Sequence, residues 1–184
     1  MKRLDRNQAI LIIVDVQEKM MPVIDGRASV ERNLERLIRG IDVLEMPVLV
    51  TEQYSKGLGI TEAPIRRALE ETGGYSPIEK SCYSAVGCNA FMDQLKQSHR
   101  PQVLVAGVET HVCVYQTVTD LISRGFDVSV VADAVSSRSP SNREIALQRM
   151  VSEGAKLTST EMCLFELLIN SGTQEFRDIS RLVK

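Results

Sequence analysis

Short apolar runs alternate along the chain with longer segments in which apolar residues recur at helical spacing. The first run, residues 9–16, is nearly continuous in apolar side chains, as expected for a strand buried on both faces. Residues 30–44 then place apolar side chains every three or four positions, which predicts an amphipathic helix. The same alternation continues to the end of the chain. It predicts strands at 9–16, 48–51, 76–80, 103–106, 128–131 and 156–158, and helices at 30–44, 64–71, 88–97, 111–123, 139–153, 160–169 and 174–183.

This order of elements predicts an α/β fold with three layers, α/β/α, in which a six-stranded parallel sheet of the Rossmann-like kind lies between helices. We expect residues 1–184 to form a single domain, because the chain has no linker rich in Pro, Gly or Ser and no internal repeat. The two C-terminal helices carry apolar side chains that suit either the core or the interface of a homo-oligomer. These are Leu164, Leu167, Leu168, Ile179 and Leu182.

Composition narrows the class of partner. The chain has 43% hydrophobic and 25% charged residues and a formal net charge of −2, a balance typical of a soluble globular protein. It disfavours nucleic acid or an anionic membrane surface as the main partner and leaves a small-molecule substrate as the expected one. The apolar run near the N-terminus is too short for a signal peptide, and no segment approaches the roughly 18 apolar residues of a membrane span. We therefore expect a cytoplasmic protein.

The cysteines and histidines argue against a metal or disulfide framework. The four cysteines stand at positions 82, 88, 113 and 163 without a Cys-x-x-Cys pair, and the chain has two histidines, His99 and His111. In a chain without a secretory signal, thiols are the default state, and the usual zinc-ligand spacings are missing. We expect no metal and no cofactor.

Polar residues follow several of the predicted strands. Asp15 ends the first strand, Lys80 ends the third, and Cys113 comes shortly after the fourth. Each has an ordinary structural explanation: a loop cap for Asp15, a solvated charge for Lys80 and a small buried side chain for Cys113. Ligands of open parallel sheets bind beyond the carboxyl ends of the strands, where all three residues fall. Their joint occurrence indicates a catalytic site.

Cys113 has a further feature that favours it as a nucleophile. It follows a strand, a glycine and a polar turn, which places it in the first turn of a helix. The helix dipole and free backbone N–H groups there favour a thiolate and could bind an oxyanion. We expect its pKa to fall below the free-cysteine value of roughly 8.5, although Asp15 acts in the opposite direction. His111 is the alternative base, but side chains two positions apart on a helix point to different faces, so a substrate contact or cap is favoured for it.

Several motifs together resemble those of the isochorismatase-like cysteine hydrolases. The resemblance covers nearly the whole chain. Within the family, the motifs are most similar to those of the branch called isochorismatase domain-containing proteins. The motifs that carry it are Asp15-Val16-Gln17, Glu79-Lys80-Ser81, the stretch 107–114 (GVETHVCV), the stretch 131–138 (VADAVSSR) and the stretch 51–59 (TEQYSKGLG).

The resemblance implies the isochorismatase-like hydrolase fold, homo-oligomers and a catalytic triad of Asp15, Lys80 and Cys113. It also implies a cis peptide between Val108 and Glu109, with the backbone of Val108, Glu109 and Val112 around the oxyanion. The activity that it implies is hydrolysis of a small amide through a thioester, with Cys113 as nucleophile, Asp15 as base and Lys80 as electrostatic partner.

Other functions remain as alternatives. Members with nicotinamidase activity carry an aspartate and histidines after the second strand as metal ligands, whereas residues 52–56 (EQYSK) contain no histidine. Isochorismatases proper, which cleave a vinyl ether, lack the cysteine. A non-catalytic binding or scaffold protein is the main rival, since a fold does not guarantee its activity. A nuclease role has neither a basic groove nor a stacking platform to support it. The candidate substrate-binding residues are Gln17, Met20, Glu52, Tyr54, Tyr83 and His111.

Overall fold

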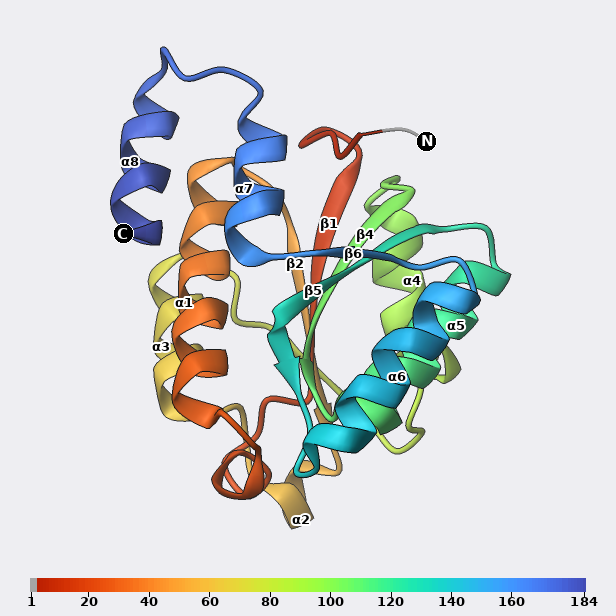
Figure 1. Cartoon of the computed structure of the whole chain (residues 1–184). Helices are drawn as coiled ribbons and strands as arrows, with labels where there is room; N and C mark the ends of the chain where they lie inside the picture. Colours follow the sequence, from red (N-terminus) through yellow and green to blue (C-terminus); the bar gives the residue numbers. More distant parts are fainter. Residues whose placement is uncertain (1–2) are drawn as a thin grey trace.

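The computed structural model describes residues 3–184 and has three layers (Figure 1). A six-stranded sheet, in which every pairing is parallel, forms the middle layer, with strand order β3-β2-β1-β4-β5-β6. The predicted α/β/α fold is therefore confirmed. The strands are β1 (Ala9–Val14), β2 (Val48–Gln53), β3 (Pro77–Lys80), β4 (Gln102–Val108), β5 (Asp127–Ser136) and β6 (Lys156–Thr158).

Helices cover both faces of the sheet (Figure 1). On one face lie α1 (Arg27–Val43), α3 (Ala63–Glu71) and α7 (Thr160–Leu168), with α8 (Gln174–Val183) packed on α1 and α7. On the other face lie α4 (Asn89–Gln97), α5 (Tyr115–Ser123) and α6 (Pro140–Ser152). The single helical turn α2 (Ser55–Leu58) lies at the carboxyl edge of the sheet, and a π-helical turn, Thr110–Val114, leads directly into α5.

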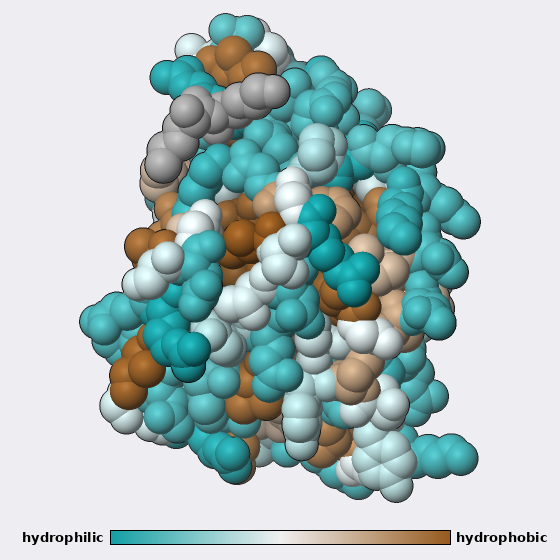
Figure 2. All heavy atoms as spheres, turned by 90° about the vertical axis from the view of Figure 1, so that its right-hand side faces the viewer, coloured by the Kyte–Doolittle hydropathy of each residue, from teal (hydrophilic) through white to brown (hydrophobic). Residues whose placement is uncertain are grey.

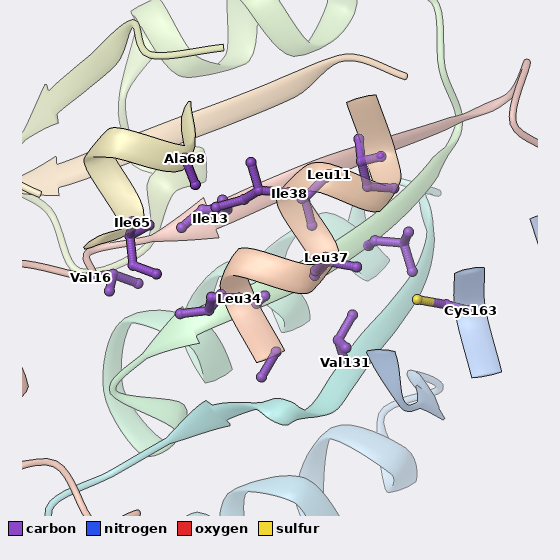
Figure 3. Packing of buried hydrophobic residues seen from close by; sticks show 14 of the residues in the cluster. Leu11, Ile13, Val16, Leu34, Leu37, Ile38, Ile65, Ala68, Val131 and Cys163 are labelled. Carbon is purple, nitrogen blue, oxygen red and sulfur yellow. The ribbon is translucent and has the colours of Figure 1, made fainter. Parts of the chain in front are cut away.

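The two cores form because the buried central strands send alternate side chains to opposite faces. All six residues of β1 are buried. Leu11 and Ile13 pack with Leu34 and Leu37 of α1 (Figure 3), whereas the neighbouring β1 side chains face α4 and α5. The nearly continuous apolar run at the start of the sequence is explained by this double burial.

The structure corrects two of the expected elements and decides between two alternatives for the C-terminal helices. β5 continues to Ser136, beyond the predicted end at residue 131, because its last residues pair with the end of β4 after a register shift. The loop after β2 contains the helical turn α2. Leu164, Leu167 and Ile179 are buried within the chain, which favours the core over an interface, the two places that the sequence left open for them.

Gly107 is the point of closest approach between β1 and β4. It pairs with Val14 and has φ of 115°, a conformation that side chains rarely adopt. A Cβ atom at this position would collide with the backbone carbonyl oxygen of Val14. The glycine thus lets the last residues of the two strands lie against each other.

One face of the molecule is mainly polar. Hydrophilic side chains cover most of the face in Figure 2, and hydrophobic areas lie between them. Within residues 3–184, no helix combines the length and the apolar character that crossing a bilayer requires.

Candidate active site

Three of the predicted site residues meet at the carboxyl edge of the sheet. The strand order changes direction between β1 and β4, and crevices at such points bind ligands in parallel α/β sheets. Asp15 directly follows β1, and Cys113 lies in the π-helical turn that begins two residues after β4. Lys80 is the last residue of β3, and it reaches across β2 to Asp15.

The Asp15 carboxylate is fixed by two hydrogen bonds in the interior. Asp15 itself adopts φ of 50°, in the left-handed region, as the chain leaves β1. Thr51 Oγ1 donates to Asp15 Oδ1 at 2.7 Å, and Lys80 Nζ donates to Asp15 Oδ2 at 2.7 Å. Both side chains of the Asp15–Lys80 pair are fully buried. A buried pair of this kind holds a charged carboxylate in one orientation, which suits a base that must receive a proton from one direction.

Lys80 is not a solvated charge. Besides Asp15, its Nζ lies 2.8 Å from Gln53 Oε1, 3.1 Å from the Tyr83 carbonyl oxygen and 3.2 Å from the Cys82 carbonyl oxygen. An ammonium has three N–H donors, so these four acceptors use all of them. Lys80 therefore acts as a positive charge that is fixed in position.

Cys113 is a buried thiol on the wall of a cavity. Burial, assisted by the negative charge of Asp15, raises its pKa to about 12, and the opposing effect of Lys80 is smaller. The expected depression of this pKa is therefore wrong, because the loss of solvation outweighs the lysine. The thiol keeps its proton at neutral pH, so a nucleophile forms only when a base takes that proton.

The turn between β4 and Cys113 has the backbone geometry that the resemblance implies. The peptide bond between Val108 and Glu109 is cis. The N–H groups of Val112 and Val114 both donate to the Glu109 carbonyl oxygen, at 3.0 and 3.2 Å. The N–H of Val112 is thus already used within the turn. The Glu109 carboxylate accepts a hydrogen bond from the Arg138 N–H at 3.0 Å and lies 3.6 Å from Arg138 Nε.

A cavity of about 380 Å³ opens beside Cys113. Two predicted substrate-binding residues, Met20 and Tyr83, line it. Gln53, Leu58 and Arg138 also line it and were not predicted. Gln53 ends β2 and Arg138 closely follows β5, so their places at strand ends could have revealed them. The full lining is Met20, Gln53, Leu58, Tyr83, Glu109, Val112, Cys113 and Arg138.

Gln17 and Glu52 do not line this cavity. Gln17 is fully buried, and its Nε2 donates to the carbonyl oxygens of Gln53 and Gly59 at 3.0 and 2.6 Å. Glu52 Oε1 accepts hydrogen bonds from the N–H and hydroxyl of Thr61, both at 2.7 Å. Side chains alternate along β2, so Glu52 points away from the face that Gln53 occupies. Both residues hold the loop after β2 in place.

Tyr54 and His111 also lie outside the cavity lining. Tyr54 is 57% exposed, and its ring lies against Gly57 in the helical turn α2. His111 Nδ1 lies 2.9 Å from Ser137 Oγ, which turns its ring toward the end of β5. This contact gives His111 a role in joining two loops. As for metals, no group of three His, Cys, Asp or Glu side chains in residues 3–184 is arranged to hold an ion.

Three comparisons bear on the family. The model of the isochorismatase domain matches residues 9–162. Isochorismatase domain-containing protein 2A from Mus musculus is 36% identical over 179 residues, which cover 96% of this chain and 82% of the mouse protein. A solved structure described as MAR1 ribonuclease from Caenorhabditis elegans superposes with a TM-score of 0.90 at 35% identity, covering 99% of this chain and 92% of that one.

A second solved structure, YcaC from Pseudomonas aeruginosa with hexane-2,5-diol and covalent acrylamide, superposes with a TM-score of 0.89 at 26% identity. The match covers 97% of this chain and 90% of that one. Fold, motifs and sequence identity therefore agree over most of the length. The chain belongs to the isochorismatase family of hydrolases, and the isochorismatase domain-containing proteins are among its relatives.

Proposed function

We propose that this protein is a cysteine hydrolase that cleaves the C–N bond of a small amide through a thioester on Cys113. One observation carries the proposal: a thiol on the wall of a cavity lies beside a buried carboxylate–ammonium pair, with 2.7 Å between Lys80 Nζ and Asp15 Oδ2. A protonated thiol needs a neighbouring base to become a nucleophile, and Asp15 is that base.

The first half-reaction forms the thioester. The Cys113 proton moves to the Asp15 carboxylate as the sulfur attacks the substrate carbonyl carbon, and the S–C bond forms. Lys80 stabilises the thiolate during this transfer. The tetrahedral intermediate places its negative charge on the former carbonyl oxygen, where the N–H of Cys113 at the start of the helix can donate to it. The C–N bond then breaks, and the Asp15 acid gives its proton to the leaving amine.

The second half-reaction releases the acid. Water enters the position vacated by the amine, Asp15 takes one of its protons, and the resulting hydroxyl attacks the thioester carbonyl. The C–S bond breaks, the proton on Asp15 returns to the Cys113 sulfur, and a carboxylic acid leaves. Asp15 thus acts twice as base and twice as acid, and Lys80 remains charged throughout.

The cavity lining indicates the kind of substrate. Met20, Leu58, Tyr83 and Val112 form its apolar part, and Gln53 contributes a neutral polar group. A volume of about 380 Å³ suits a small metabolite better than a polymer segment. The YcaC structure contains covalent acrylamide, itself a small amide with an apolar end. We propose a small amide with a compact apolar acyl group.

The test is a panel of small amides together with a vinyl ether and RNA, because a relative carries the name ribonuclease. Release of amine, with an acyl adduct on the Cys113 peptide in mass spectrometry, is the expected result, and both should vanish in Cys113→Ala. Prior dialysis against EDTA should leave turnover unchanged. Cleavage of RNA or of the vinyl ether alone would replace the proposal, and binding without turnover of any compound would indicate a scaffold protein.

Two further properties accompany this proposal. We propose a homo-oligomer in the cytoplasm: symmetric assemblies are common among soluble enzymes, and all four cysteines are free thiols. Light scattering at micromolar protein, and fractionation of cells that express the protein at natural levels, test the two statements. A monomer, or recovery outside the cytoplasm, would contradict them.

A further inference from the structure

Gln53 joins the cavity to the Asp15–Lys80 pair. Its Oε1 accepts a hydrogen bond from Lys80 Nζ at 2.8 Å, and its Nε2 donates to the Ser81 carbonyl oxygen at 2.8 Å. Gln53 lines the cavity, whereas the side chains of Asp15 and Lys80 are fully buried behind it. A molecule in the cavity therefore meets Gln53 and Cys113 before it meets the ion pair.

The backbone of Gln53 is fixed as firmly as its side chain. Its N–H donates to Gln17 Oε1 at 2.7 Å, and its carbonyl oxygen accepts from Gln17 Nε2 at 3.0 Å. Gln17 is fully buried and lies two residues after Asp15. The Gln17 N–H donates in turn to the Asp15 carbonyl oxygen at 2.9 Å, so the ends of β1, β2 and β3 are joined in a closed ring of polar contacts through Asp15, Lys80, Gln53 and Gln17.

The chemistry of this ring depends on Gln53 being neutral. A carboxylate in its place would compete with Asp15 for the same ammonium, while the amide oxygen holds the ammonium without cancelling its charge. We infer that Gln53 is a positioning residue for the proposed hydrolysis: its neutral amide fixes Lys80 and leaves the positive charge to Asp15 and the Cys113 thiolate. This inference rests on the proposed function, and it assigns to Gln53 the position and effective charge of Lys80 in the same site.

The charges that face Cys113 make the inference measurable. Asp15 and Glu109 raise the pKa of the thiol, and Lys80 is the group that lowers it. Arg138 lies beyond Glu109 and is paired with it. A carboxylate at position 53 would weaken the effect of Lys80, so thiolate formation at Cys113 should become harder.

The experiment measures alkylation of Cys113 by limiting iodoacetamide at about pH 9, where the rate follows the small thiolate fraction. Peptide mapping compares the unsubstituted protein with Gln53→Glu, Gln53→Met and Leu58→Glu. We expect Gln53→Glu to be labelled at least about fivefold more slowly. Gln53→Met has similar size but neither a charge nor the oxygen that holds Lys80. Its alkylation should stay within about twofold, since Lys80 keeps its charge, whereas its kcat for the amide should fall as that of Gln53→Asn does. Leu58→Glu puts a carboxylate on the wall of the same cavity without replacing a partner of Lys80, so it should slow labelling less than Gln53→Glu does.

The controls decide the outcome. If Gln53→Met slows alkylation of Cys113 as much as Gln53→Glu does, the effect does not come from the added charge. If Leu58→Glu slows it as much, any carboxylate in the cavity has the same effect. Either result, or an unchanged alkylation rate in Gln53→Glu, overturns the inference. If Gln53→Glu does not fold, Gln53→Asn withdraws the oxygen from Lys80. Its kcat for the amide should then fall by about tenfold at unchanged KM, and an unchanged kcat overturns the inference.

Failure of the proposed function gives a different pattern. If no amide is turned over but Gln53→Glu still slows alkylation selectively, Gln53 positions Lys80 in a site with another chemistry. If amides are turned over but alkylation ignores Gln53, the hydrolase proposal stands without this residue.

Discussion

The two buried cysteines, Cys113 and Cys163, have the same thiol chemistry in very different surroundings. Burial is the first cause that raises the pKa of each to about 12, and a nearby carboxylate is the second, Asp15 for Cys113 and Asp133 for Cys163. Cys113 lines a cavity and has Lys80 beside its carboxylate. Cys163 belongs to α7 and packs in the core with side chains of α1 and β5 (Figure 3).

The carboxylates differ as much as the thiols. Asp133 Oδ1 accepts hydrogen bonds from the N–H and hydroxyl of Thr160, at 2.8 and 3.0 Å, so it fixes the start of α7. Asp15 is held by Lys80 and Thr51 in the interior behind the cavity wall. A raised pKa, caused first by burial and then by a nearby carboxylate, is thus common to both thiols and does not distinguish them. Access to a cavity and a charged base held by a cation separate the proposed nucleophile from a core residue.

Removal of each sulfur gives the largest expected contrast. Cys113→Ala should lower kcat/KM for the best amide by at least about 10³-fold, because no other group replaces the attacking atom. Cys163→Ala should leave kcat/KM within about threefold and lower the free energy of unfolding by about 1–2 kcal/mol, as removal of a small buried group does. Steady-state kinetics and urea unfolding of both variants check this. Full activity in Cys113→Ala would end the proposed mechanism.

The two aspartates give the next contrast. Asp15→Asn should lower kcat by at least about 10²-fold, because the amide cannot take the thiol proton. Asp133→Asn is the matched control: it should keep kcat and cost about 1 kcal/mol of stability through the weakened start of α7. Both variants are compared by turnover and by thermal unfolding. Equal losses of activity would mean that Asp15 acts through the fold rather than through proton transfer.

Alkylation of the free protein ranks the thiols by access. The half-exposed Cys82 and Cys88 should react first with iodoacetamide at neutral pH, then Cys113 through its cavity, and Cys163 last by at least about tenfold. Activity should fall with the label on Cys113 and not with the earlier labels. Time-resolved peptide mapping with parallel activity assays follows both. Loss of activity in step with Cys82 would make Cys82 the nucleophile.

The smallest effect is on stability in alkaline solution. Each buried thiol has an unfolded-state pKa near the reference 9.0 and a folded-state pKa of about 12. Above pH 9 the unfolded chain therefore binds fewer protons, and stability falls as pH rises toward 12, by about 1.4 kcal/mol per pH unit for each thiol. Cys113→Ala and Cys163→Ala should each reduce this slope. Urea unfolding between pH 8 and 10 measures it, and an unchanged slope in both variants would mean that neither thiol causes the loss.

Much of this molecule could be predicted from the order of its residues. Alternation of buried strands and amphipathic helices indicated the sheet, and the strand ends indicated Asp15, Lys80 and Cys113. The pKa of Cys113 could not be predicted, because it depends on how deeply the fold buries the thiol and on how close it brings the Asp15 carboxylate. The sequence also could not show that Gln53 and not Glu52 lines the cavity. Adjacent residues at a strand end point to opposite faces, and the sequence does not reveal on which face the cavity lies.

The contact between Gly107 and Val14 limits how this site can vary. The collision that any side chain at position 107 would cause lies one residue before Asp15 and six residues before Cys113. A methyl group there would push the two strand ends apart while leaving every reactive atom in the molecule. Such a variant would keep all three side chains of the proposed mechanism and change only their positions relative to one another. Its activity would therefore measure how much catalysis depends on the alignment of these side chains by the backbone.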